Sequence, residues 1–160
     1  EFITQKVTEL GASQIWAFPA GWSVAKWDGK KLGKKVEKLE KIALGAAEQS
    51  KRNLVPSITL FEKKADFLAQ FDQFDRIVVA YEESAKEGEV AALLQSLTGL
   101  ETGAKLLFIF GPEGGLSPAE IESFTAKGAV LAGLGPRILR AETAPLYALS
   151  AVSVVTELMN

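Results

Sequence analysis

Carboxylates, guanidinium groups, hydroxyls and backbone amides are the groups with which this chain can do chemistry. Its 160 residues include no Cys and no His. Disulfides, structural zinc sites, thiol nucleophiles and mechanisms that need an imidazole base are therefore excluded. Any reaction must use acids, Lys, Arg, hydroxyls, the backbone or a cofactor, and the sequence predicts no metal site.

A glycine-rich segment reads Gly-Pro-Glu-Gly-Gly at residues 111–115 and follows an apolar run. After it, Ser117 and Glu120 have the spacing of a capping box, with Pro118 at the first helical position. The segment lacks the Lys-Ser/Thr end of a P-loop and the spacing of a dinucleotide fingerprint, so it does not indicate a phosphate cradle. By itself it is typical either of a tight turn that needs glycine or of a functional loop.

A second motif, which carries charged residues, precedes the last apolar segment. Arg140 and Glu142 flank the predicted start of the last helix. The helix dipole favours an acid at this end, and the Thr143 side chain can help to cap the helix. A helix cap with a surface Arg explains this cluster taken alone. The glycine-rich segment and this cluster each follow one of two successive predicted strands. Together they indicate a functional site more strongly than either does alone.

Strands and helices alternate along the chain. We predict strands at residues 14–18, 57–61, 76–81, 105–110 and 129–132, and helices up to Gly11 and at 35–50, 65–71, 89–97, 118–127 and 143–158, with a long loop at 20–33. This order predicts an α/β fold with a mostly parallel sheet flanked by helices. Ligands of such sheets bind beyond the carboxyl ends of the strands, which are Tyr81-Glu82, residues 110–112 and Leu134-Gly135.

Composition predicts one soluble domain, with 48% apolar and 24% charged residues. The net charge is −2, yet residues 26–52 carry nine Lys and Arg against four acids. This segment fits either docking on RNA phosphates or a solvated Lys-rich face. The longest nearly uncharged stretch, residues 143–156, is too short to span a bilayer, so we predict no membrane contact and a cytoplasmic location. Its helix is apolar nearly all round, which requires cover in a core or at a subunit interface.

Four ordered motifs give the chain a family resemblance. They read QKVTELG at residues 5–11, AAEQSKR at 46–52, GPEGGLSPAEIESF at 111–124 and LGPRILRAETA at 134–144. Together they closely resemble the RsmE-type 16S rRNA (uridine-N3)-methyltransferases of the SPOUT superfamily. The resemblance covers essentially the whole chain and implies S-adenosylmethionine-dependent methylation of a uridine in small-subunit rRNA.

The resemblance also implies a fold with a C-terminal deep trefoil knot, an exception to the usual absence of knots. The implied domain is residues 1–160, and the family's N-terminal PUA-like RNA-binding domain has no counterpart in them. We therefore expect that a preceding segment is missing. Family members are homodimers in which the last knot helix packs across the interface, and their partner is 16S rRNA or the small ribosomal subunit.

S-adenosyl-L-methionine would be held mainly by loop backbone, where glycines allow close approach. The implied cofactor-binding residues are Tyr81, Glu82, Gly111, Pro112, Glu113, Gly114, Gly115, Leu134, Gly135, Ile138, Leu139 and Arg140.

Methylation of uridine N3 requires loss of a proton, so the site needs a base or a group that stabilises an anion. We expect Arg140 and Glu142 to be catalytic, because the family motif places residues there beside the cofactor. Glu113 and Glu82 are alternative proton acceptors, and Arg52 is an alternative anion stabiliser.

The expected RNA-binding residues are Arg52, Gln49, Lys26, Lys30 and Lys31. Trp22 and Trp27 near these lysines could stack on bases. A structural ion pair is an equally good interpretation of Arg52. Lys6 and Glu9 also match the family motif, but their i, i+3 spacing on a helix is explained more simply by a surface pair.

Other activities remain as alternatives. A ribose 2′-O-methyltransferase or a guanosine N1-methyltransferase of the same superfamily would use a similar knot and cofactor. A non-catalytic α/β binding module, for example a receiver-like domain, would require acids after the first strand, where the chain has Pro19-Ala20-Gly21.

Overall fold

The computed structural model describes residues 1–21, 28–82 and 92–159. The described helices are α1 (Phe2–Glu9), α2 (Gly29–Gln49), α3 (Lys64–Leu68), α5 (Ala92–Leu97), α6 (Pro118–Ala126) and α7 (Ala144–Ser153), with a 3-10 turn η1 (Phe71–Gln73) and a π-helical turn η2 (Val154–Leu158). The strands are β1 (Gln14–Ala17), β2 (Ser57–Leu60), β3 (Arg76–Ala80), β4 (Leu106–Ile109) and β5 (Val130–Ala132). Each predicted strand and helix has a counterpart within these residues, although residues 89–91 of the helix predicted at 89–97 lie outside the described part of the chain.

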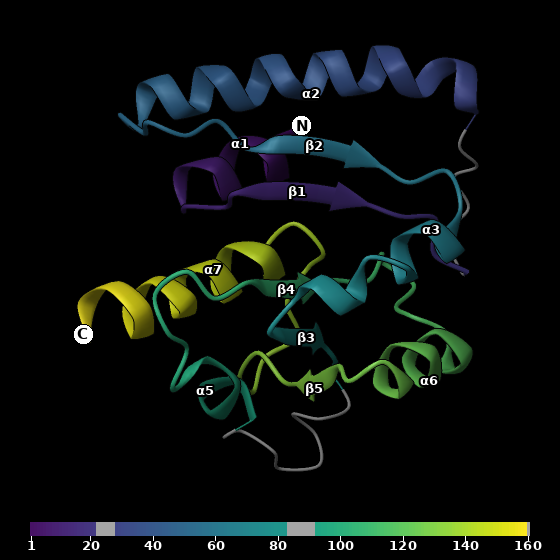
Figure 1. The fold of residues 1–160 in the computed structure, drawn as a ribbon, viewed down its shortest axis with the longest axis vertical. Coiled ribbons are helices and arrows are strands. Elements are labelled where there is room, and N and C mark those ends of the chain that lie inside the picture. The colour runs from purple at the N-terminus through teal and green to yellow at the C-terminus, as the bar shows by residue number, and fades with distance from the viewer. Residues whose placement is uncertain (22–27, 83–91, 160) are drawn as a thin grey trace.

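The described strands form two parallel sheets rather than one (Figure 1). β1 pairs with β2, and β3 lies between β4 and β5. α1 and α2 cover the smaller sheet, while α5, α6 and α7 surround the larger one (Figure 1). The α/β class and the parallel pairing are confirmed, and the division into two sheets is a detail that alternation of elements does not predict.

Aromatic packing joins the two sheets. Phe67, Phe71 and Phe124 are fully buried, and Trp16 and Phe18 from the β1 region pack against them. The rings of Phe18 and Phe67 stack with centroids 4.4 Å apart, and most of the other ring pairs meet edge to face. Burial of a side chain of this size contributes about 2 kcal/mol, so this cluster fixes α3 and α6 against β1.

The predicted loop at residues 20–33 is too long. α2 begins at Gly29, because the Asp28 carboxylate accepts a hydrogen bond from the backbone N–H of Lys30 at 3.0 Å and caps the helix. Gly29 and Gly33 favour a loop by residue type, but both lie within the helix. Residues 22–27, with Trp22, Lys26 and Trp27, lie outside the described part of the chain.

The larger sheet brings three loops together. β3, β4 and β5 run parallel, so the segments after Ala80, Ile109 and Ala132 leave the same edge of this sheet. Residues 83–91, after the first of these strand ends, lie outside the description. Among the described helices, none is long and apolar enough to cross a membrane.

Candidate active site

The loop after β4 is a tight turn that needs glycine. Its turn is closed by the Gly115 N–H, which donates to the Pro112 carbonyl oxygen at 2.8 Å. Gly115 has φ +78°, a conformation that side chains rarely adopt, and nothing lies within 4 Å of where its Cβ would be. A Cβ on Gly111 would meet Leu116 Cγ at 3.0 Å. The loop is therefore internally packed on one side, while Glu113 and Gly114 are exposed.

The predicted capping box is confirmed. Ser117 Oγ accepts from the Glu120 N–H at 3.1 Å, and a Glu120 carboxylate oxygen accepts from the Ser117 N–H at 2.9 Å. Together with Pro118 this pair starts α6 directly after the glycine-rich turn. The turn is thus held between β4 and a helix whose first residues are well fixed.

Glu120 does more than cap. Its side chain is only 2% exposed, and its second oxygen accepts from the Gly21 N–H and from Lys64 Nζ, each at 3.0 Å. Burial acts to raise the pKa of this carboxyl, but the donors on Ser117, Lys64 and Gly21 together hold it below its ordinary value. The ionised carboxylate therefore ties the start of α6, which follows the glycine-rich loop, to the segment after β1 and to α3.

Sequence reasoning found Glu120 only as a capping residue. The Ser-x-x-Glu spacing indicates a capping box. It does not indicate contacts with Gly21 or Lys64, which lie 99 and 56 positions away in the sequence. Contacts at such separations depend on tertiary packing.

The loop after β5 also needs glycine. Gly135 has φ +87°, and a Cβ there would lie 3.1 Å from the hydroxyl oxygen of Tyr147 on α7. The loop backbone is consequently close to the last helix. Leu134, Gly135 and Leu139 are half-buried, whereas Ile138 is 76% exposed.

Arg140 and Glu142 lie at the start of α7, as predicted. The Arg140 carbonyl oxygen accepts from the backbone N–H groups of Thr143 and Ala144, at 2.9 and 3.1 Å. Arg140 is exposed and Glu142 half-buried. Within the part of the chain that the structure describes, neither side chain has an ion pair, so both are available to a ligand.

The expected cap by Thr143 is wrong. Thr143 occupies the N-cap position, but its side chain makes no capping hydrogen bond. Its backbone is already helical, at φ −85° and ψ −37°, whereas a capping side chain needs an extended backbone. Pro145 in the first turn supports the helix start instead.

The third strand end is Tyr81-Glu82. The Tyr81 N–H donates to the Ala132 carbonyl oxygen at 3.0 Å, which extends the pairing of β3 with β5 by one residue. Tyr81 is half-buried and Glu82 exposed. The predicted cofactor residues thus come from three loops at one sheet edge, and the two that follow β3 and β5 are hydrogen-bonded neighbours.

Of the predicted RNA-binding residues, Lys26 lies outside the described part of the chain, and the other four lie on α2 or just after it. Lys30, Lys31 and Gln49 are exposed on α2. The Arg52 guanidinium donates to the carbonyl oxygens of Thr8 and Ala12 at 2.9 and 2.8 Å, beside the end of α1. These hydrogen bonds hold Arg52 against the end of α1 through carbonyl oxygens, where an ion pair was the alternative interpretation, and its predicted contact with RNA stays a prediction. Lys6 and Glu9 form the predicted surface pair, with 2.9 Å between ammonium and carboxylate.

No cluster of three or more acidic residues suited to a metal ion occurs among the residues described. The chemistry available at this edge is backbone recognition by glycine-rich loops, with the guanidinium of Arg140 and the carboxylate of Glu142 among the charged groups beside them.

Comparisons with known proteins agree with this architecture. Residues 1–153 match the family described as "RNA methyltransferase domain". "Ribosomal RNA small subunit methyltransferase E" of Bacillus subtilis is 53% identical over the whole chain, and the chain covers 62% of that protein. The protein of the same name from Mesomycoplasma hyopneumoniae is 33% identical over 94% of the chain, which again covers 62% of the relative. The chain thus spans under two thirds of these curated relatives.

A solved structure has the same fold. It is the ribosomal RNA small subunit methyltransferase E of Neisseria gonorrhoeae bound to S-adenosyl methionine, with a TM-score of 0.77 and 26% identity over 96% of this chain and 60% of that one. The fold, the strand-end loops and the match over 153 residues lead to one conclusion: this chain belongs to the RNA methyltransferase domain family.

Proposed function

We propose that this chain is the catalytic domain of an S-adenosylmethionine-dependent methyltransferase that acts on N3 of a uridine in 16S rRNA. The observation that carries the proposal is the set of three loops at one edge of a parallel sheet, two of them shaped by glycines at positive φ. The names of the relatives from Bacillus subtilis and Mesomycoplasma hyopneumoniae favour small-subunit rRNA as the substrate. An rRNA substrate implies a cytoplasmic location.

The loops fit the cofactor chemically. Recognition by backbone groups requires that main chain comes close to the ligand, and open space around the missing Cβ of Gly115 provides this at one loop. Three loops would hold S-adenosylmethionine: Gly111 to Gly115, Leu134-Gly135 with Ile138 to Arg140, and Tyr81-Glu82. When bound, S-adenosylmethionine supplies an electrophilic methyl group on a sulfonium. The chain mainly aligns the uridine with that group.

Glu142 and Arg140 perform the proton and charge chemistry. Glu142 accepts the N3 proton of uridine, since the chain has no imidazole and this carboxylate is half-buried at a helix start. Arg140 stabilises the uridine anion that remains. Within the described residues neither side chain forms an ion pair, and this supports both roles.

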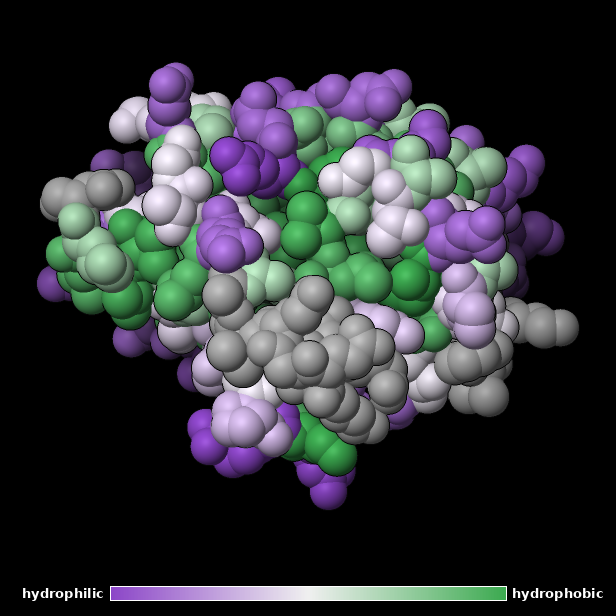
Figure 2. All heavy atoms as spheres, turned by 90° about the horizontal axis from the view of Figure 1, so that it is seen from below, coloured by the Kyte–Doolittle hydropathy of each residue, from purple (hydrophilic) through white to green (hydrophobic). Residues whose placement is uncertain are grey.

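The proposal includes a homodimer and a C-terminal deep trefoil knot. Apolar side chains at the end of the chain are exposed, among them Tyr147, Val154 and Leu158 at 39, 45 and 74%. Figure 2 shows apolar surface on the side where Figure 1 places α7 and the C-terminus. A second copy of the chain covers this surface. The knot is proposed on the resemblance of the four sequence motifs to the SPOUT superfamily.

A calorimetric titration of the purified chain with S-adenosylmethionine tests the cofactor, with ATP as the matched control. We expect saturable micromolar binding, about −7 to −8 kcal/mol, for the former and none for ATP. Absence of binding by a folded, dimeric chain would contradict the cofactor assignment.

Mass analysis of nucleosides tests the target. Small subunits or naked 16S rRNA incubated with the protein and cofactor should gain 3-methyluridine. A ribose-methylated nucleoside or 1-methylguanosine would instead assign one of the alternative activities. Because the chain spans 62% of its Bacillus subtilis relative, we expect cofactor binding to persist even where methylation is slow.

A further inference from the structure

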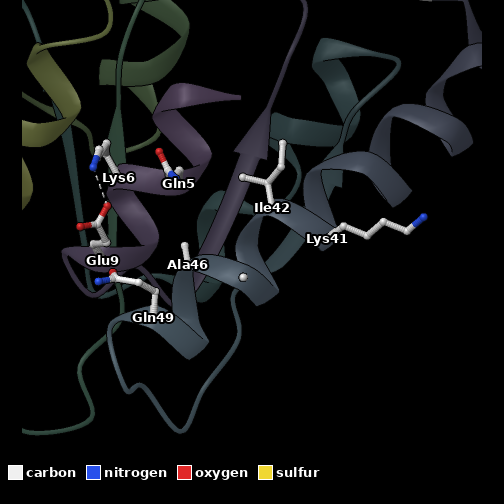
Figure 3. A pocket seen from close by; sticks show the side chains of 8 residues that line it. Gln5, Lys6, Glu9, Lys41, Ile42, Ala46 and Gln49 are labelled. Carbon is white, nitrogen blue, oxygen red and sulfur yellow. Dashed lines mark ion pairs between the residues drawn. The ribbon is translucent and has the colours of Figure 1, made fainter.

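A polar hollow of about 460 Å³ lies between α1 and α2, outside the loops that follow β3, β4 and β5 (Figure 3). Gln5, Lys6 and Glu9 line it from α1, and Ile42, Ala46 and Gln49 line it from α2. Two segments that are separated by about forty positions in the sequence therefore contribute to one concave surface.

Contacts that join α1 to α2 and the segment after it lie at both ends of the hollow. At one end the Arg52 guanidinium holds the carbonyls of Thr8 and Ala12, at 2.9 and 2.8 Å. At the other end Lys38 of α2 forms an ion pair with Glu1. Gly45 has no side chain to fill the space between them, and nothing lies within 4 Å of where its Cβ would be.

The lining offers the chemistry that recognises a nucleobase. Gln5 and Gln49 are both exposed, and within the described residues neither side-chain amide has a hydrogen-bond partner. Each amide presents a donor and an acceptor, which is what the edge of an unpaired base requires. Ile42 and Ala46 supply an apolar floor, and the Lys6–Glu9 pair adds further polar groups.

The size and the surrounding charge select the ligand. Pockets for small ligands measure about 300–1,000 Å³, so this one can receive a single nucleotide. One side of the hollow belongs to the segment of residues 26–52, whose sequence has nine Lys and Arg against four acids. In Figure 3 Lys41 extends away from the other lining side chains, and because it is exposed it can reach a phosphate beside the hollow rather than inside it. The lining has two lysines, Lys6 and Lys41, against one acid, Glu9, and this excess of positive charge favours RNA over a docked protein segment.

We propose that the hollow between α1 and α2 binds one nucleotide of single-stranded RNA, with Gln5 and Gln49 on the base edge and Lys41 on the backbone phosphate. This rests on the proposed function for the choice of RNA. The site is separate from the cofactor loops, so the two can fail independently.

The test measures binding of a fluorescent, single-stranded RNA of mixed sequence by anisotropy, over a range of salt concentrations. The double variant Gln5→Ala/Gln49→Ala should bind about tenfold more weakly, with an unchanged salt dependence, because amides neutralise no phosphate. Lys41→Gln should instead reduce the slope of log K against log salt by about 0.7. Gln95→Ala, an exposed glutamine on α5, is the matched control and should bind like the unsubstituted chain.

A calorimetric titration with S-adenosylmethionine accompanies each variant. Unchanged cofactor affinity with weakened RNA binding supports the hollow as an RNA site. Equal RNA affinity of the double variant and the control, or no RNA binding by the unsubstituted chain, overturns it while leaving the cofactor site standing. If the unsubstituted chain does not bind S-adenosylmethionine, that result counts against the proposed function instead.

Crosslinking with 4-thiouridine RNA is a second test of the hollow. It should label peptides of α1 or α2, and labels confined to other segments would also overturn the proposal.

Discussion

At the scale of single residues, the buried carboxylate of Glu120 has consequences for stability. Donors from Ser117, Gly21 and Lys64 meet it, and its pKa is lowered despite burial. A carboxyl whose pKa is lower in the folded than in the unfolded chain stabilises the fold above the unfolded value, near 4.5. That stabilisation disappears as the pH falls through the folded value.

Glu120→Gln should therefore lower the free energy of unfolding at neutral pH by about 2 kcal/mol. Urea unfolding at pH 7 and at about pH 4 measures this, and the difference between variant and parent should shrink at the lower pH. Glu122→Gln, an exposed position on the same helix, is the control. Similar losses in both variants would show that the buried hydrogen bonds contribute little.

Arg140 is the residue whose chemistry is most open to test. Its side chain is exposed and has no ion pair within the described residues, so its removal leaves no buried group unsatisfied. Arg140→Ala should reduce the methylation rate by about 100-fold or more, with thermal stability unchanged. The neighbouring exposed Arg137→Ala is the control. An Arg140→Ala variant as active as this control would remove Arg140 from the catalytic role.

At the scale of elements, the loop between β5 and α7 depends on one glycine. Gly135→Ala places a side chain at φ +87° and 3.1 Å from the Tyr147 hydroxyl, so we expect a loss of about 1–2 kcal/mol in unfolding free energy. Cofactor affinity should fall with it, because the loop backbone moves.

Gly33→Ala provides the opposite case. Gly33 lies within α2 with open space around its missing Cβ, so the substitution should stabilise the fold by about 1 kcal/mol. Chemical denaturation of both variants, with a cofactor titration of each, makes the comparison. Equal effects at the two positions would show that backbone conformation at Gly135 is not limiting.

At the scale of the whole molecule, the exposed apolar end of the chain governs assembly. Leu158 in η2 is 74% exposed, so in a monomer this apolar side chain would be in contact with water. Leu158→Glu should shift a dimer toward monomer by at least about tenfold in the dissociation constant, measured by sedimentation velocity. Leu54→Glu, exposed beyond the end of α2, should leave assembly unchanged. A monomeric parent chain would contradict the proposed dimer.

The sequence by itself determined the order and type of the elements. Apolar periodicity and turn residues act locally, so the strands, the helices and the capping box at Ser117 and Glu120 are all found where they were predicted. The start of α2 is an exception. Glycines at positions 29 and 33 favour a loop in the sequence, whereas the structure has a helix that begins after the Asp28 cap.

The tertiary structure alone decided which distant residues meet. The burial of Glu120 with Gly21 and Lys64, the division into two sheets and the anchoring of α1 by Arg52 all join positions far apart in the chain. A local pattern carries no information on such pairs, because their geometry follows from how aromatic side chains pack between the sheets. For the same reason the motifs named Gln5 and Gln49 separately, and only the packing of α1 on α2 placed them around one hollow.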